Sequence, residues 1–395
     1  MTARVNVGDS HNFGRRVSVG ARRVRKPRAI LWEWLILGAD SPLRRLLEDV
    51  ADRDGLGRRA FGFLPKLRFY PSADRVGGEV ERIRLDPLRV RSAESRRGLA
   101  EIVGRSLALF SWLGVSDLHW ENLVLGVGAR GGVVFAPLDV EIILGDLALP
   151  TETKLLPDAD PEYAAVCRHA CGVRRVLPYL GKPVGVDDLL AMAGAYRGTL
   201  SLLDRHASTI ADVFASLPGL RETPIRVCLR GTDEYVRARS EPLWPPLLDA
   251  EAEQLSRGDI PYFFRLYGRP GIHYFGDRGL GRIKRIALEG DGHRLDPILR
   301  LSRAFRSPSR KKLREEGLFT LLGAFDHPSW VGRHKNDELE VTFRARTVVV
   351  TFPTGEQLHA RRNMGAFVES VYLPCACGEV RSVFVPPVTV CELGS

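Results

Sequence analysis

The chain has 395 residues, which is enough for two or three packed units. The most apolar stretch near the start, residues 29–38, holds Glu33 and is shorter than the roughly 18 apolar residues of a membrane-spanning helix. Residues 1–9 lack the apolar centre of a signal peptide. The net charge of +10 would suit a polyanion, but no nucleic-acid-binding module is recognisable. We therefore expect a cytoplasmic protein with no membrane span and no nucleic-acid partner.

The N-terminal quarter is predicted to combine short strands with helices. Residues 9–28 contain a glycine turn and alternating valines, which favours a short hairpin. Apolar residues at helical spacing predict a helix over residues 29–52, with a break or a new helix start at Pro42. A strand is predicted at residues 66–70, and an amphipathic helix follows over residues 96–113.

The rest of the chain continues this mixture. Residues 116–122 are predicted as a loop, and residues 300–317 are basic and are predicted to end as a helix. The other predicted elements are strands at 123–126, 133–138, 225–229, 340–343, 347–352 and 380–385, and helices over 185–217 and 232–256. The pattern predicts an α+β protein whose last part, beyond a boundary within residues 305–335, is a small β-rich unit.

The sequence Asp117-Leu-His119-Trp-Glu-Asn122 precedes the predicted hairpin, and Asp139-Val-Glu141 follows it. Phosphoryl transfer needs a carboxylate near the attacking hydroxyl and oxygen ligands that hold Mg²⁺ on the phosphates. An Asp, an Asn five residues later and an Asp after the next strand provide that set. A plain surface loop is the alternative interpretation.

Basic and polar residues also gather in two other stretches. Asp9, His11 and Lys26 lie in the N-terminal hairpin, where a lysine after a glycine turn suits contact with phosphate oxygens, although such hairpins are more often surface features. Arg226 lies on a predicted strand that runs into a helix start, where Thr232 is predicted as the N-cap and an anion would be favoured. The alternative there is an ordinary strand–turn–helix.

Two further patterns are predicted to carry no chemistry. The stretch over residues 257–263 is predicted as a turn with buried aromatic residues. The cysteines form no disulfide framework. A zinc site could in principle combine the Cys167, His169 and Cys171 cluster with Cys375 and Cys377, but the spacings are not those of common zinc modules.

Taken in order, these stretches resemble the dehydratase domain of class II (LanM-type) lanthipeptide synthetases. The matching segments are Asp9–Arg15, Arg25–Arg28, Asp117–Asn122, Asp139–Glu141, Arg226–Tyr235 and Gly258–Phe263. The resemblance covers roughly residues 5–300. The family's large region before the first segment and its cyclase have no counterpart here, and Gly231 stands where the family usually has Pro.

The resemblance implies a two-lobed, lipid-kinase-like α+β fold that binds ATP and Mg²⁺. Residues 1–95 would form the N-lobe-like part, residues 96–305 the C-lobe-like part, and residues 306–395 the C-terminal unit, which has no assigned role. The implied activity is phosphorylation of Ser or Thr in a peptide, followed by elimination of the phosphate to give dehydroalanine or dehydrobutyrine.

The resemblance also assigns the phosphorylation residues. Asp117 and His119 would orient or deprotonate the hydroxyl. Asn122 and Asp139 would hold Mg²⁺, with Glu141 nearby in the nucleotide site. Lys26 would contact phosphate.

For elimination, Arg226 and Thr232 match the positions that the family uses, with Arg226 binding the departing phosphate. Asp9 and His11 match a further pair in the same cleft, whose work is not divided between the two steps. The implied partners are a ribosomally made precursor peptide and, as candidates, a separate cyclase or leader-binding protein. The alternatives are a kinase without elimination and a non-catalytic peptide-binding subunit.

Overall fold

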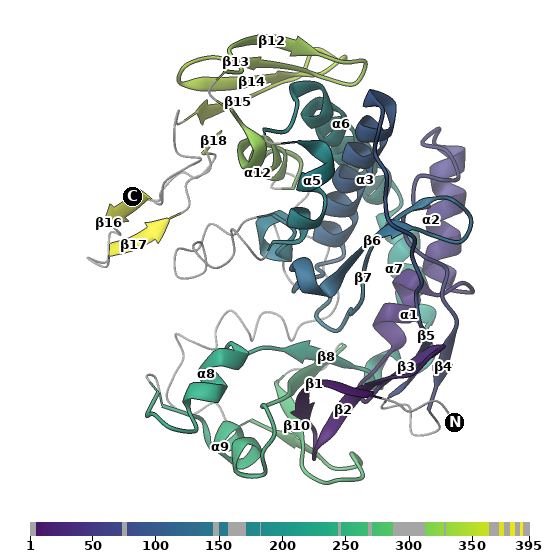
Figure 1. The fold of residues 1–395 in the computed structure, drawn as a ribbon, viewed down its shortest axis with the longest axis vertical. Helices are drawn as coiled ribbons and strands as arrows, with labels where there is room; N and C mark the ends of the chain where they lie inside the picture. The colour runs from purple at the N-terminus through teal and green to yellow at the C-terminus, as the bar shows by residue number, and fades with distance from the viewer. Residues whose placement is uncertain are drawn as a thin grey trace.

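The computed structural model describes residues 5–72, 77–144, 150–156, 171–181, 183–243, 246–267, 271–286, 313–327, 329–362, 371–374, 380–383 and 388–389. Helices and several small sheets alternate along the chain, so the α+β prediction is confirmed. In the view of Figure 1, helices α3 and α6 and the C-terminal strands lie in the upper half, and strands β1, β2, β8 and β10 lie in the lower half. No helix in the described part is both long and apolar enough to cross a membrane.

A five-stranded antiparallel sheet forms the N-terminal part. Its strands in spatial order are β1 (Val5–His11), β2 (Arg15–Val19), β3 (Arg23–Lys26), β5 (Gly78–Glu81) and β4 (Phe69–Pro71). Helices α1 (Leu31–Leu37) and α2 (Pro42–Arg53) follow β3, and Ser41 caps α2 by accepting a hydrogen bond from the Arg44 amide. Pro42 begins the second helix, as predicted, because a proline at the first helical position has no N–H to satisfy.

The centre of the protein is a helical core built on α3 (Ala93–Trp112) and α6 (Val186–Arg205). Ser92 and Ser95 form a capping box at the start of α3. The two helices approach closely at Gly104, where a Cβ atom would lie 2.1 Å from the carbonyl oxygen of Met192. The smaller helices here are α5 (Leu177–Leu180), α7 (Ala207–Ser216) and the single turns η2 (Pro150–Thr153), η3 (Gly172–Arg175) and η4 (Leu220–Glu222).

A two-stranded hairpin follows α3 and places the predicted phosphoryl-transfer residues. The turn η1 (Trp120–Asn122) leads into β6 (Leu123–Val127), which pairs with β7 (Val133–Pro137). The pairing continues one step past the strands, because the Leu138 amide donates to the Asn122 carbonyl oxygen at 2.7 Å. The residue before β6 and the residues after β7 therefore meet at one end of the hairpin.

A second antiparallel sheet has its own small clusters of buried residues on its two faces. Its strands in spatial order are β11 (Ile283–Arg285), β10 (His273–Phe275), β9 (Phe263–Leu266) and β8 (Pro224–Val227). The predicted helix over residues 232–256 is wrong: the structure has two helices, α8 (Thr232–Arg237) and α9 (Asp249–Ser256). Pro242 and Pro246 lie between them, and proline cannot continue a helix interior.

The C-terminal strands share the core of the helical part. Their sheet has the spatial order β12 (Gly332–Lys335), β13 (Glu340–Phe343), β14 (Thr347–Thr351), β15 (Gln357–Arg362) and β18 (Val388–Thr389), and β16 (Val371–Pro374) pairs with β17 (Val380–Val383). Val341 and Val350 belong to the same buried cluster as α3, α6 and α12 (Glu316–Phe325). Arg362 and Asp326, both almost fully buried, form an ion pair that ties β15 to the end of α12.

Candidate active site

A pocket of about 1110 Å³ lies where the N-terminal sheet, the β6–β7 hairpin and the β8–α8 segment meet. All ten residues predicted for the site line this pocket. They are Asp9, His11, Lys26, Asp117, His119, Asn122, Asp139, Glu141, Arg226 and Thr232. Segments that lie far apart in the sequence therefore converge on one space.

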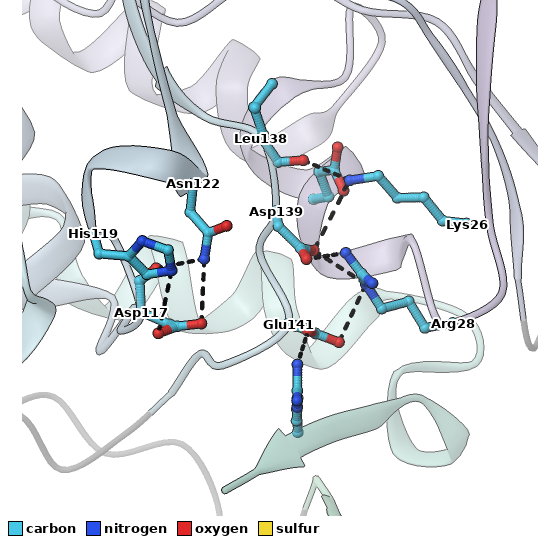
Figure 2. A network of polar contacts seen from close by, with 10 residues as sticks. Lys26, Arg28, Asp117, His119, Asn122, Leu138, Asp139 and Glu141 are labelled. Atoms are coloured by element: carbon cyan, nitrogen blue, oxygen red, sulfur yellow. Dashed lines mark hydrogen bonds and ion pairs between the residues drawn. The ribbon is translucent and has the colours of Figure 1, made fainter. Parts of the chain in front are cut away.

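The loop before β6 presents Asp117 to the pocket. The Asp117 backbone is left-handed, with φ of +66°. The side-chain amide of Asn122 donates to the Asp117 carbonyl oxygen at 2.9 Å and to its carboxylate Oδ2 at 3.2 Å. Lys154 donates to the other carboxylate oxygen, Oδ1, at 3.0 Å, and His119 Nε2 lies 4.0 Å from the same atom. These four residues form the Asp117 cluster, and Figure 2 shows three of them, Asp117, His119 and Asn122.

Asn122 and Asp139 can provide oxygen ligands for a magnesium ion. The Asn122 amide nitrogen is engaged by Asp117, so the amide oxygen points away from Asp117 (Figure 2). Mg²⁺ usually takes one or two protein oxygens and completes its shell with water and substrate phosphates. Arg28 engages both carboxylate oxygens of Asp139, so the residues fit a Mg²⁺ ion that arrives with a nucleotide only if Arg28 shares Asp139 with that ion. Within the described part, no group of three or more His, Cys, Asp or Glu side chains gathers as a metal site.

A series of ion pairs between largely buried side chains lines the pocket beside this loop. We call it the buried charge ladder, and it consists of Lys26, Glu33, Arg28, Asp139, Glu141 and Arg226. Lys26 pairs with Glu33, donates to the Leu138 carbonyl oxygen at 2.5 Å and lies 3.9 Å from Asp139. Arg28 pairs with Asp139, and its Nε lies 3.2 Å from Glu141. Arg226 completes the ladder by pairing with Glu141.

The ladder shifts the pKa of Glu141 and of Arg226 toward their charged forms, whereas burial shifts that of Lys26 the other way. Burial alone would raise the pKa of Glu141, but the Arg226 and Arg28 guanidinium groups lower it to about 2. Burial alone would lower the pKa of Arg226, yet Glu141 raises it above its usual value. Burial lowers the pKa of Lys26, and Glu33 opposes that effect. The ladder is therefore a mutually dependent set of buried ions.

His11 lies at the end of the pocket that contains Arg226, where burial and the Arg226 charge disfavour its protonated form. Its Nδ1 lies 2.8 Å from the carbonyl oxygen of Ile260, and a carbonyl can only accept, so Nδ1 carries a proton and Nε2 is the nitrogen that can accept one. Burial, followed by the Arg226 charge, lowers the pKa of His11 below 6.5. The ring packs edge-on against Tyr262. His11 can therefore act as a base near neutral pH.

The other two predicted residues at this end occupy simpler positions. Asp9 is exposed on β1. Thr232 is half-buried and is the first residue of α8, so its prediction as the N-cap is wrong. Gly231 is the N-cap, and its amide donates to the Glu234 side chain at 2.9 Å. A Glu three residues after the cap satisfies this amide and leaves the Thr232 hydroxyl without a capping role.

Asp259 locks the hairpin that carries His11. It is fully buried and accepts from the Ser10 hydroxyl at 2.7 Å and from the Phe13 and Gly14 amides at 2.6 and 2.9 Å. Burial alone would raise the pKa of Asp259, but these hydrogen bonds, with that from the Ser10 hydroxyl first, lower it. Phe13 has a left-handed backbone, with φ of +71°. The stretch over residues 257–263, which was predicted to carry no chemistry, thus contains Asp259, and Asp259 fixes the turn between β1 and β2.

Sequence reasoning missed four residues of the site: Arg28, Glu33, Lys154 and Asp259. Glu33 had a signal, since it is the one charge in the apolar stretch of α1. Arg28 had a weaker signal in the basic segment around Lys26. Lys154 had none, because the residues around it match no motif.

No protein-family model and no curated protein matches this chain. The family resemblance of the motifs therefore stays a prediction, and the geometry of the pocket carries the functional argument. The zinc alternative is untested, because Cys167, His169, Cys375 and Cys377 lie outside the described residues, as does most of the basic stretch over residues 300–317. Cys171 is described and is buried beside the loop before β6, where it forms a backbone bridge with His119.

Proposed function

We propose that this chain is an ATP- and Mg²⁺-dependent dehydratase of the lanthipeptide-synthetase type. It phosphorylates Ser or Thr of a ribosomally made peptide and then eliminates the phosphate to give dehydroalanine or dehydrobutyrine. One observation carries the proposal: all ten residues that the motifs assign to these two steps line a single pocket. A two-lobed, lipid-kinase-like arrangement around that pocket is part of the same proposal.

The pocket has an apolar end suited to a nucleotide base. Its lining there comes mainly from the N-terminal sheet and consists of Val17, Val19, Val24, Leu67 and Val80. Small-molecule sites occupy about 300–1,000 Å³, so this volume can take a nucleotide together with a peptide side chain. Lys26 lies on the same wall, where its ammonium group would meet the phosphates.

In the transfer step, the peptide hydroxyl oxygen attacks the γ-phosphorus of ATP. The bond from that phosphorus to the β–γ bridging oxygen breaks, ADP leaves, and the hydroxyl proton passes to Asp117. Asn122 orients the Asp117 carboxylate by donating to Oδ2 at 3.2 Å. A bound Mg²⁺, held by Asn122 and Asp139, would neutralise charge on the phosphates.

In the elimination step, His11 Nε2 takes the α-proton of the phosphorylated residue. The electron pair of that C–H bond forms the new double bond, and the C–O bond to the phosphate breaks. Arg226 stabilises the departing phosphate by a charge-assisted hydrogen bond, and Thr232 lines the same end of the pocket. Tyr262 packs against both His11 and Arg226, which keeps the base and the arginine close together.

The second candidate is a kinase that does not eliminate. One observation favours it: Arg226 is already paired with Glu141, so its guanidinium must share or exchange that partner to bind phosphate. The dehydratase proposal therefore needs a phosphate that competes with Glu141 for Arg226.

The test is to incubate the chain with Mg·ATP and a Ser/Thr-containing peptide from a neighbouring reading frame, followed by mass spectrometry. The dehydratase gives a product lighter by one water per site. A product heavier by one phosphoryl group that persists supports the second candidate. Failure to bind Mg·ATP at millimolar concentration, with no change in any peptide, contradicts both and favours a non-catalytic subunit. The Asp117→Asn variant is the matched control for contaminating kinases.

A further inference from the structure

Lys154 holds the oxygen of Asp117 that Asn122 leaves free. The Lys154 ammonium lies 3.0 Å from Asp117 Oδ1, whereas Asn122 engages Oδ2, so each carboxylate oxygen has its own donor. Lys154 and Asp117 both line the pocket, with side chains 40% and 31% exposed. The pair is therefore built at the place where a substrate hydroxyl would enter.

Both members of this pair have strained backbones. Lys154 has φ of +63° and Asp117 has φ of +66°, in a region that residues other than glycine rarely adopt. Such conformations persist only where the surroundings fix them, and they concentrate at functional sites. An exposed ion pair adds little stability, so stability alone does not account for two strained residues in contact.

The turn η2 delivers Lys154 to this position through several hydrogen bonds. The Leu118 amide donates to the Thr153 carbonyl oxygen at 3.0 Å, and the Ser116 hydroxyl donates to the Glu152 carbonyl oxygen at 2.8 Å. On the other side, the Gly172 amide donates to the Lys154 carbonyl oxygen at 2.9 Å. The segment is therefore docked directly on the loop that carries Asp117.

We propose that Lys154 is a positioning residue for phosphoryl transfer: it orients the Asp117 carboxylate toward the attacking hydroxyl. This inference rests on the proposed function. Lys154 serves the transfer step alone, because its partner is Asp117, whereas the proposed elimination groups His11 and Arg226 contact Tyr262 and, for Arg226, Glu141. A residue with this role changes kcat of transfer, and it leaves the KM for ATP and the elimination rate unchanged.

The experiment compares Lys154→Met and Lys154→Arg with a matched control, Lys284→Met. Lys284 is also a partly exposed lysine with a carboxylate partner, Glu253 at 2.9 Å, and it lies outside the pocket lining. Transfer is measured with Mg·ATP and the peptide, and elimination is measured separately with the same peptide made synthetically with phosphoserine. We expect Lys154→Met to lower kcat of transfer about 10- to 100-fold, as for the loss of one charge-assisted hydrogen bond. Lys154→Arg restores most of that loss, and Lys284→Met matches the wild type.

Three results would overturn the inference. They are an unchanged kcat of transfer in Lys154→Met, an equal loss of transfer and elimination, and a loss that Lys154→Arg does not reduce. A wild-type chain that transfers no phosphoryl group refutes the proposed function instead. A wild type that is active while Lys154→Met is equally active refutes only the role of Lys154.

Discussion

The buried charge ladder and the Asp117 cluster are both groups of ion pairs in one pocket, but they differ in their contact with water. Side chains of the ladder are 4–19% exposed, whereas Asp117, His119 and Lys154 are 27–40% exposed. A buried charge is costly when it loses its partner, and a hydrated charge is not. The ladder should therefore matter for folding, and the cluster should matter mainly for chemistry.

The two groups also differ in what they connect. The ladder joins strand β3, helix α1, the segment after β7, and strand β8, which belong to separate sheets and helices. The Asp117 cluster joins only the loop before β6 and the turn η2. Because the buried charge ladder connects separate elements, the arrangement of those elements depends on its charges. Four predictions follow from this difference, given from the largest expected effect to the smallest.

The largest expected effect is on catalysis. Asp117→Asn should lower the rate of phosphoryl transfer about 10²–10⁴-fold, because the amide cannot accept the hydroxyl proton. The same change should alter the free energy of unfolding by no more than about 0.5 kcal/mol, since the side chain is partly hydrated. Single-turnover transfer and urea unfolding measure the two quantities. A variant that keeps its activity, or that loses several kcal/mol of stability, breaks the comparison.

The next effect is on stability. Glu141→Ala should lower the free energy of unfolding at pH 7 by about 3–5 kcal/mol, because it leaves Arg28 and Arg226 without their shared buried partner. Urea denaturation of the purified variant measures the change. The control is Glu356→Ala, which removes the exposed partner of Arg197 and should cost less than about 1 kcal/mol. If the two variants lost the same free energy of unfolding, burial would not make the ion pairs of the ladder more stabilising than an exposed pair.

The sequence predicted the site better than the surroundings that position it. One hairpin separates Asp139 from Asp117 and Asn122, so local spacing was enough to predict that the three residues lie near one another. The contacts of Asp259 join residues 245 to 249 positions apart, and no local pattern reports such a distance. Lys154 reaches Asp117 only because the turn η2 docks on the loop, which is a tertiary effect.

The fold shows the same division. The long helix α3 and the β6–β7 hairpin were predicted, because the apolar periodicity over residues 96–113 and the glycine turn between the strands are strong local signals. Strand β9 was missed because all four of its residues are buried and show no alternation, and strands β10 and β11 have only three residues each. The single helix predicted over residues 232–256 gave too little weight to its internal prolines.

The third prediction tests the ladder by pH. Glu141 has a pKa of about 2 in the folded protein and 4.5 when unperturbed. A lowered folded-state pKa adds stability that is complete above pH 4.5 and is lost as the pH falls from 4.5 toward 2. The difference corresponds to about 3 kcal/mol. Urea midpoints between pH 7 and pH 2 should therefore fall less steeply in Glu141→Gln than in the wild type, and parallel acid limbs would contradict the prediction.

The smallest effect comes from a pair on the same strand as Lys26. Arg23 lies on β3 and pairs with Glu79 on β5, but its side chain is 46% exposed, compared with 7% for Lys26. Arg23→Gln should lower the free energy of unfolding by at most about 1 kcal/mol, even though the Arg23 guanidinium also lies 3.8 Å from the centre of the Tyr70 ring. Arg23 and Lys26 lie on the same strand and each pairs with a glutamate, Glu79 on β5 and Glu33 on α1, so exposure is the main variable that differs. If Arg23→Gln lowered the free energy of unfolding as much as Glu141→Ala does, an exposed ion pair would stabilise the protein as much as a buried one. Burial could then no longer explain why the ladder and the Asp117 cluster behave differently.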